Sequence, residues 1–324
     1  MRVYLDGRCN LEWPEQVNAQ IQQGQSARGG FWKKLNNWWG GDEDAGAGSA
    51  LSAIPDRSVP LTDAERDWPN ERVRVLKGLF GDGLIAPWSD KMQEHLIRKL
   101  KVKDDSRVVV MGGGLGGPAH RLQAATGASV VAFDDRIEIA DLARDWLAEQ
   151  GSEVKQDRRD YFETGLKPDF ADAIVAFGGF SHIRDRKRLF HHLLQILRPN
   201  GRIVYMDFFI TGRDPHCPEV AIWSALEDRP RYLTSEQKLS DLVYEIGFDQ
   251  PGFRDITSQY QAGIKAAFVR SVDVLKEAGP DAIRVQPALI GEIEWWNRRL
   301  ALIESGEARF QEVTIEYFGK SAVV

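Results

Sequence analysis

The sequence has 324 residues, of which 43% are hydrophobic and 28% charged, and its formal net charge is -6. These proportions exclude a disordered chain, and no apolar run reaches the roughly 18 residues of a membrane-spanning helix. The acidic balance argues against a nucleic-acid partner, because phosphate backbones are normally bound by a basic stripe. The charged start lacks the apolar core of a secretory signal, so we expect a cytoplasmic location. Cys9 and Cys217 have no paired spacing and predict neither a disulfide framework nor a thiolate metal site.

The first sixty residues are rich in glycine and other small residues and predict a flexible N-terminal tail. Within this tail, the aromatic segment "FWKKLNNWW" (31–39) is expected to pack on its own domain rather than on a membrane or a partner. Residues 61–105 then show apolar side chains at helical spacing, which predicts a helical lead-in.

Residues 106–210 alternate short apolar runs with amphipathic segments, which is the pattern of a parallel sheet covered by helices on both faces. We therefore predict an α/β fold with a doubly wound sheet, whose ligand site lies at the carboxyl ends of the strands. The expected strands are 107–111, 128–133, 171–177 and 202–209, and the expected helices are 118–126, 136–151 and 186–197.

The alternation of strand and helix patterns ends in residues 211–324. A long connecting segment leads to a helix over 234–247, for which Thr234 and Gln237 are spaced as a capping box and Gly247 is the expected end. A short strand is expected at 252–256, two helical stretches between 259 and 305, and an alternating closing strand at 308–318. Helices inserted here predict a lid over the ligand site.

The stretch "VVVMGGGLGGPAHRL" (108–122) combines a strand, a glycine-rich turn and a helix start. Gly112, Gly114 and Gly117 meet the pattern G-x-G-x-x-G, and Asp134 ends the next strand. A nucleoside cofactor needs such a turn without Cβ atoms, helix amides facing its anionic part and an acid for its ribose hydroxyls. Dinucleotide oxidoreductases and methyltransferases share these needs, so the glycines alone do not choose between them.

From about Val108 to Asp207 the sequence resembles the class I S-adenosylmethionine-dependent methyltransferases. The matching stretches are "VVVMGGGLGGP", "VVAFDD", "RRDYF", "ADAIVAFGGFSHI" and "LRPNGRIVYMD". The layout is similar to the branch that methylates small metabolites, with its helical insert before the last strand. The resemblance implies a seven-stranded Rossmann-like sheet, S-adenosyl-L-methionine as the cofactor and a small-molecule substrate. The oligomeric state stays open, with a homo-oligomer among the alternatives.

The resemblance also implies roles for individual residues. It places the glycine loop at the methionine end of the cofactor, Asp134 at the ribose hydroxyls, and the acidic turn after the third strand beside the adenine. Asp135 is instead expected to be the N-cap of the helix that begins at Arg136. The full set of implied cofactor contacts is Gly112, Gly113, Gly114, Gly116, Asp134, Asp160, Tyr161 and Phe177.

His182 follows the fourth strand, where a substrate is expected to enter, and is the first candidate for a catalytic base, with Tyr232 second. A histidine satisfied by loop packing is the competing interpretation. His191 and His192 point apart on their helix and are expected in solvent, so no metal site is predicted. The lid offers an aromatic wall for a cationic or planar substrate, although each ring taken alone is more typical of a core position. The expected substrate contacts are Gly179, Trp223, Tyr260 and Trp295.

One residue departs from the family pattern. The family usually has an acid two positions before the first loop glycine, where it anchors the amino end of the cofactor, and this chain has Val110. Two alternatives therefore stay open beside the methyltransferase: a nicotinamide-dependent oxidoreductase that uses the same glycines, and a methyltransferase-like binding protein without catalysis.

Overall fold

The computed structural model describes residues 70–212 and 217–319, which belong to one compact unit, Leu61–Val324. The predictions for the tail 1–60, including its aromatic segment, lie outside the described residues, and the helical lead-in is described from residue 70. None of the described helices combines the length and hydropathy that a bilayer span requires.

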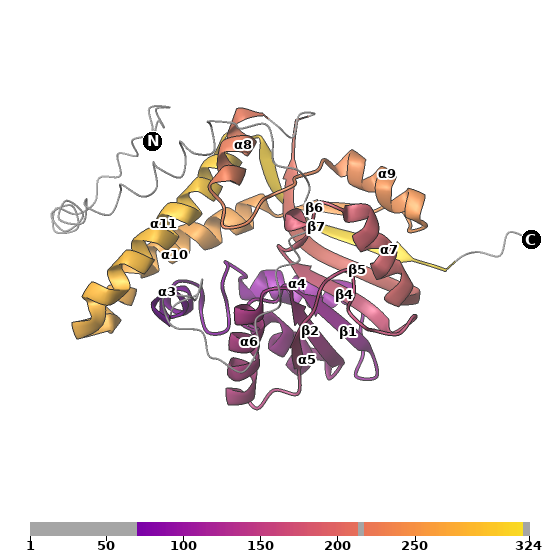
Figure 1. The fold of residues 1–324 in the computed structure, drawn as a ribbon, viewed down its shortest axis with the longest axis horizontal. Coiled ribbons are helices and arrows are strands. Elements are labelled where there is room, and N and C mark those ends of the chain that lie inside the picture. The colour runs from indigo at the N-terminus through magenta and orange to yellow at the C-terminus, as the bar shows by residue number, and fades with distance from the viewer. Residues whose placement is uncertain (1–69, 213–216, 320–324) are drawn as a thin grey trace, which may run out of the picture. The chain divides into compact units, whose positions relative to one another are not determined.

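A seven-stranded sheet in the order β3-β2-β1-β4-β5-β7-β6 forms the centre of this unit (Figure 1). The first five strands in this order are parallel, but β7 runs antiparallel to both of its neighbours. The parallel pairing predicted for the strands of residues 106–210 is confirmed, and the antiparallel β7 makes the seven-stranded sheet mixed. The strands are β1 (Arg107–Met111), β2 (Ser129–Asp134), β3 (Lys155–Arg158), β4 (Ala171–Phe177), β5 (Leu197–Ile210), β6 (Gly252–Asp255) and β7 (Ala308–Tyr317).

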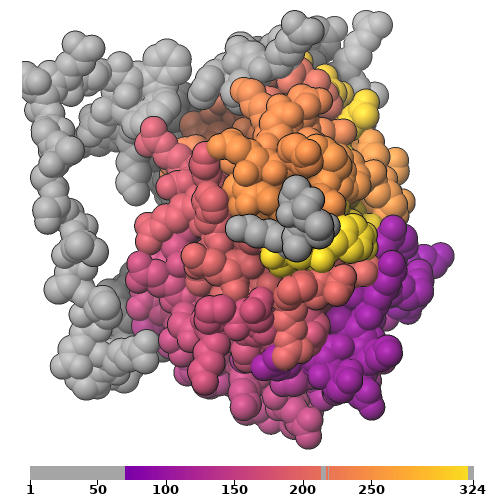
Figure 2. All heavy atoms as spheres, turned by 90° about the vertical axis from the view of Figure 1, so that its right-hand side faces the viewer, coloured from indigo at the N-terminus to yellow at the C-terminus, as the bar shows by residue number. Residues whose placement is uncertain are grey.

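Helices cover both faces of this sheet, as the strand and helix rhythm predicted. The helices are α3 (Asn70–Phe80), α4 (Asp90–Leu100), α5 (Gly117–Thr126), α6 (Ile137–Glu149), α7 (Arg186–Ile196), α8 (Pro218–Ala225), α9 (Glu236–Ile246), α10 (Thr257–Ala278) and α11 (Ala282–Glu304). One apolar core joins the sheet to α3–α6, α10 and α11, and a second joins its other face to α7 and α9. Figure 2 views the side of α7 and α9 and shows the C-terminal segments, in orange and yellow, packed closely on the central ones.

Local sequence signals fix where the helices begin and end. The Ser89 hydroxyl accepts from the Met92 amide at the start of α4, and the Asp185 carboxylate accepts from the Arg188 amide at the start of α7. The capping-box prediction at Thr234 is wrong by one residue, because Ser235 is the N-cap of α9 and accepts from the Lys238 amide. This helix ends at Gly247 as predicted, in the left-handed conformation that favours glycine.

Helices α10 and α11 form a long pair beside α3, between β6 and β7 in the chain (Figure 1). Together with the segment between α8 and α9, they cover one side of the strand ends. This is the position predicted for a lid, and the carboxyl ends of β1, β2, β4 and β5 open toward it.

Candidate functional site

The glycine-rich turn after β1 is shaped by close packing. Gly114 and Gly116 have left-handed φ values of 61° and 96°. A Cβ on Gly114 would lie 2.8 Å from the Ile85 side chain, and one on Gly116 would lie 2.9 Å from Leu147. Side chains at these positions are therefore excluded by the protein itself. Of the predicted loop glycines, Gly112 lines the pocket described next.

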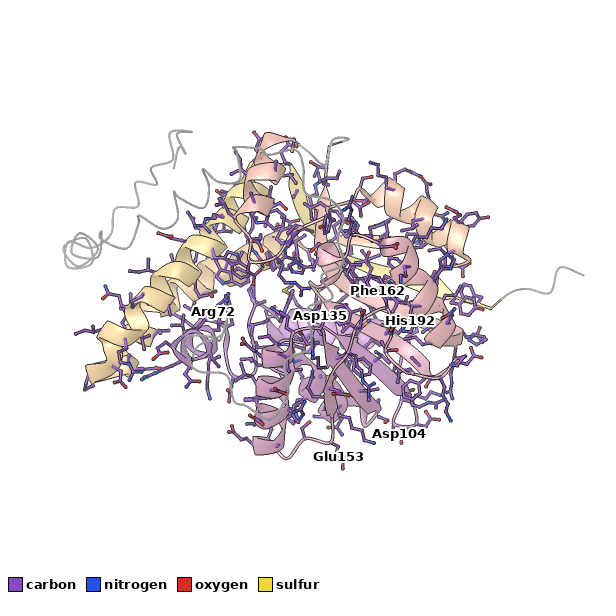
Figure 3. All side chains as sticks on the ribbon, viewed as in Figure 1. Arg72, Asp104, Asp135, Glu153, Phe162 and His192 are labelled. Atoms are coloured by element: carbon purple, nitrogen blue, oxygen red, sulfur yellow. The ribbon has the colours of Figure 1, made fainter. Side chains whose placement is uncertain are left out.

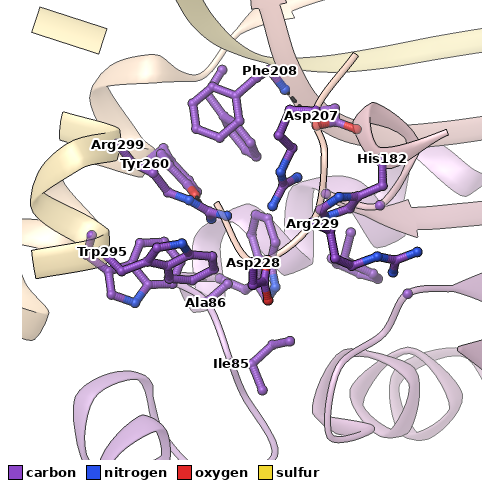
Figure 4. Close-up of a pocket in the computed structure, with 18 of the residues that line it drawn as sticks. Ile85, Ala86, His182, Asp207, Phe208, Asp228, Arg229, Tyr260, Trp295 and Arg299 are labelled. Atoms are coloured by element: carbon purple, nitrogen blue, oxygen red, sulfur yellow. Dashed lines mark hydrogen bonds between the residues drawn. The ribbon is translucent and has the colours of Figure 1, made fainter. Parts of the chain in front are cut away.

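This cavity, the pocket below, has a volume of about 780 Å³, including the part open to solvent. Its first end is formed by Gly112, Tyr161, Phe177, Gly178 and Gly179, at the carboxyl ends of the parallel strands. A Cβ on Gly179 would meet no described atom within 4 Å, so the backbone there borders open space. Its second end lies under α10 and α11 (Figure 4).

The second end of the pocket is aromatic, as the sequence predicted, but a cation of the protein already occupies the wall. The Arg299 guanidinium lies 3.9 Å from the Trp295 ring centroid and 4.7 Å from that of Trp296. It also donates to the Tyr260 hydroxyl at 3.1 Å. Figure 4 shows Arg299 beside Tyr260 and Trp295. The rings therefore contact the Arg299 guanidinium, and the ring faces that it covers are not free to bind a substrate cation.

A short connection crosses the pocket between α8 and α9, and we name residues 227–232 the strap. Arg229 of the strap makes a two-pronged ion pair with Asp135, with N–O distances of 2.9 and 2.5 Å. The Tyr232 amide donates to the Ser181 carbonyl at 2.7 Å. The strap thereby joins the lid to the segment after β2 and to the turn after β4. Figure 3 shows Asp135 at the centre of the molecule, at the opposite end of the strands from Asp104 and Glu153.

His182 lines the pocket beneath the strap. Its Nδ1 lies 3.2 Å from the Pro230 carbonyl oxygen, and because a carbonyl only accepts, Nδ1 carries the proton. The other ring nitrogen, Nε2, is then a hydrogen-bond acceptor. Burial, with the charges of Arg231 and Arg229, holds the pKa of His182 well below its usual range. The imidazole is therefore neutral near pH 7 and a weak proton acceptor.

Asp134 ends β2 as predicted, but it does not line the pocket. Its side chain is 1% exposed, and its carboxylate accepts from the Arg136 guanidinium at 3.0 and 3.3 Å. Burial raises the pKa of Asp134, although Arg136 acts in the opposite direction. Arg136 itself lines the pocket. The prediction that Asp135 is an N-cap is wrong. Its carboxylate pairs with Arg229, and the N-cap of α6 is Arg136, which makes no side-chain hydrogen bond to the helix start.

The remaining predicted residues divide between the pocket and its surroundings. Asp160 is exposed and accepts from the Phe162 amide. Trp223 is buried behind Phe208, with ring centroids 5.3 Å apart, and Tyr232 meets the pocket region through its backbone. His192 is half-buried against the Thr164 hydroxyl, which corrects the prediction of a solvated side chain. Gly113, Gly114, Gly116, Asp134, Asp160, Trp223 and Tyr232 are outside the pocket lining.

The sheet distinguishes the two cofactor classes that the glycines left open. The dinucleotide-binding fold has the order 3-2-1-4-5-6, whereas here an antiparallel β7 lies between β5 and β6. A family model described as "Methyltransferase domain" matches residues 108–201. Residues 108–201 thus form a methyltransferase domain. The fold and the methyltransferase domain implied by the resemblance are thereby confirmed.

Three relatives illustrate the match to this methyltransferase family. Methyltransferase GfsG of Streptomyces halstedii is 28% identical over 60% of this chain and 75% of its own length. Phosphoethanolamine N-methyltransferase 1 of Zea mays is 21% identical over 91% of this chain, which spans 54% of that protein. The structure of Haemonchus contortus phosphoethanolamine N-methyltransferase 2 with S-adenosyl-L-methionine has a TM-score of 0.67 at 17% identity, covering 78% of this chain and 58% of that one. The chain thus spans about half the length of these phosphoethanolamine methyltransferases.

The sequence did not predict Arg231 and Arg299, which line the pocket, or Glu227, the carboxylate that pairs with both. The Glu227 side chain is 1% exposed and accepts from both Arg231 and Arg299, at distances between 2.7 and 3.0 Å. Burial disfavours its charge, but the two guanidinium groups outweigh burial and lower its pKa. The only sequence signal was the charged run "EDRPR" (227–231) within the long excursion.

Proposed function

We propose that the protein transfers a methyl group from S-adenosylmethionine to a small molecule enclosed between the strap and the aromatic wall. The observation that carries this proposal is the continuity of the pocket, which runs from Gly112 and Gly179 at the strand ends to Tyr260 and Arg299 beneath the lid. One pocket thereby borders both the glycine loop and a second enclosed space. A methyltransferase needs this arrangement, because donor and acceptor must meet within one water-excluded cavity.

The cofactor fits the first end of the pocket with one condition. Gly112 has a left-handed φ of 67°, and its missing Cβ leaves space in front of Tyr161. Tyr161 and Phe177 would border the nucleoside, and the Asp134 carboxylate would accept from ribose hydroxyls. The condition is that these hydroxyls compete with Arg136 for that carboxylate. Val110 is fully buried beneath the loop, so the amino end of the cofactor would be met by other groups.

When bound, S-adenosylmethionine would supply an electrophilic methyl group: the acceptor lone pair would form the new bond to the methyl carbon, S-adenosylhomocysteine would leave with the electrons of the carbon–sulfur bond, and the acceptor's proton would pass to solvent. The chain contributes orientation and the exclusion of water. The strap encloses the acceptor, and the Nε2 atom of neutral His182 accepts a hydrogen bond from its N–H or O–H group. Because the pKa of His182 is so low, this residue orients the acceptor rather than storing its proton.

The relatives support an acceptor of metabolite size. GfsG is named as a methyltransferase, and the plant and nematode proteins are named for phosphoethanolamine. A cytoplasmic location, as expected from the sequence, is part of this proposal.

A transfer assay tests the proposal and separates it from the two alternatives. The protein is incubated with S-adenosylmethionine labelled in its methyl group and a panel of small amines, phenols, carboxylic acids and phosphate esters. We expect label in one class of acceptor and an equal amount of S-adenosylhomocysteine. S-adenosylhomocysteine binding with no transfer to any class would support a binding protein without catalysis. Binding of reduced nicotinamide dinucleotide in its place would support an oxidoreductase.

A further inference from the structure

Five arginines line the pocket, and they differ in how their charges are balanced. Four of them have a carboxylate partner. These pairs are Arg72 with Glu292, Arg136 with Asp134, Arg229 with Asp135, and Arg299 with Glu227. Arg231 shares Glu227 with Arg299, which already donates to both oxygens of that carboxylate. Arg231 is therefore the arginine in the pocket without a carboxylate of its own.

The hydrogen bonds of Arg231 are incomplete. Its side chain is 5% exposed, and its two terminal nitrogens donate to the Ser181 hydroxyl at 2.9 Å and to Glu227 at 2.8 Å. Its Nε–H has no acceptor among the described residues. A buried donor without an acceptor costs about 1–3 kcal/mol, more when it is charged, so such a group is normally satisfied by a ligand or water.

The charges that face Arg231 leave its cation poorly compensated. Burial and then the Arg299 guanidinium lower the pKa of Arg231, against Glu227, Asp207 and Asp228. Asp207 is buried, but its two oxygens accept the backbone amides of Ser181 and Phe208, which already stabilise its charge. Asp228 is exposed to solvent. Arg231 therefore has a second cation, Arg299, beside it, and no nearby carboxylate in the described part of the chain neutralises Arg231 alone. This arrangement favours the binding of an additional anion at Arg231.

A second unpartnered donor lies next to Arg231. The Trp223 ring centroid is 5.7 Å from the Arg231 guanidinium carbon, and the buried Trp223 indole N–H also has no acceptor among the described residues. Among the described residues, the Arg231 Nε–H and the Trp223 indole N–H are thus both donors without an acceptor, and Arg231 is the one of the two that lines the pocket. The complementary ligand is therefore one that offers acceptor oxygens.

We propose that the methyl acceptor carries an oxyanion, a carboxylate or a phosphate, that binds Arg231 beneath the strap. This inference rests on the proposed function and adds the chemical class of the substrate. The oxyanion would accept from the Nε–H and the terminal N–H groups of Arg231, in the forked geometry that guanidinium offers to such groups. Held there, the acceptor has its reacting atom on the side of His182 and Gly179, toward the cofactor end of the pocket.

Calorimetry on the full chain saturated with S-adenosylhomocysteine tests this inference. O-phosphoethanolamine probes a phosphate, sarcosine probes a carboxylate, and ethanolamine is the uncharged-oxygen control. We expect one of the two anionic probes to bind, and Arg231→Gln to weaken it at least tenfold while the affinity for S-adenosylhomocysteine changes less than twofold. Arg144→Gln removes the same charge from the exposed face of α6, 51% exposed, and should change neither affinity.

The outcomes separate this inference from the proposed function. If S-adenosylhomocysteine binds but neither anion binds, or if anion binding is equal in Arg231→Gln, the inference is overturned and the function stands. If an anion binds through Arg231 but S-adenosylhomocysteine does not bind, the function is overturned. Should Arg231→Gln not fold, Arg231→Lys keeps the buried charge but loses the forked donors, and we expect at least a fivefold loss of anion affinity.

Discussion

Replacing Glu227 by glutamine should destabilise the protein strongly, because this carboxylate holds two buried guanidinium groups. The Glu227 side chain is 1% exposed, that of Arg231 is 5% exposed and that of Arg299 is 7% exposed. Removing one partner of a buried ion pair typically costs about 3–5 kcal/mol, because the remaining charge stays buried. Here two cations remain, so the upper part of this range applies. For a chain of this size, a cost of about 4–5 kcal/mol corresponds to a fall in Tm of roughly 6–10 °C.

Urea denaturation followed by circular dichroism measures this cost. Glu163→Gln is a matched control, because the Glu163 side chain is 75% exposed and pairs with Arg188 on the surface, where such pairs contribute at most about 1 kcal/mol. Combining Glu227→Gln with Arg299→Met should recover part of the lost stability, because the double variant removes one buried cation. A loss below about 1 kcal/mol for Glu227→Gln would refute the reasoning that these three charges are buried together.

Two further predictions concern the strap and its neighbours. Arg229→Gln removes the half-buried ion pair between Arg229 and Asp135, which contributes about 1 kcal/mol and joins the strap to the segment after β2. Because the strap is then held less firmly, S-adenosylhomocysteine should dissociate about fivefold faster, as measured by stopped-flow fluorescence. Strong salt should reproduce this effect in the wild type and not in the variant; an unchanged rate in both would show that the pair does not hold the strap. The pKa of His182 is lower in the folded state than in the unfolded state. As the pH decreases below about 6.5, the unfolded state therefore binds a proton that the folded state does not, and the free energy of unfolding decreases by up to about 1.4 kcal/mol per pH unit. His182→Asn, which keeps a nitrogen donor for Pro230, should reduce this slope in denaturation curves between pH 5 and 6.5, and equal slopes would contradict a buried neutral imidazole.

Much of the fold could be predicted from local pattern. The bounds of β1 and β4 agree with the predicted 107–111 and 171–177, because both are short, mostly apolar runs that are followed directly by glycine. The direction of β7 could not be predicted, since the alternation of buried and exposed residues along a strand is the same whether its neighbours run parallel or antiparallel to it. The capping error at Thr234 has a similar origin, because Thr234 and Ser235 are adjacent and both suit a helix start.

The site was less predictable because its decisive contacts join distant parts of the chain. Gly112, Gly179 and His182 were found because they follow strands whose carboxyl ends mark the ligand site. Arg229 pairs with Asp135 across 94 residues, and Arg299 pairs with Glu227 across 72, and no local spacing encodes either pairing. The same long-range pairing explains why Asp135 was wrongly expected to be a helix cap.

The central claim is that the first end of the pocket binds the adenosyl cofactor. Titration calorimetry with S-adenosylhomocysteine measures this directly on the full chain and on Asp134→Ala. The account predicts binding of one molecule per chain and a loss of about 10- to 100-fold in Asp134→Ala, the effect of removing hydrogen bonds to a charged group. No measurable binding by the wild-type protein would contradict the claim.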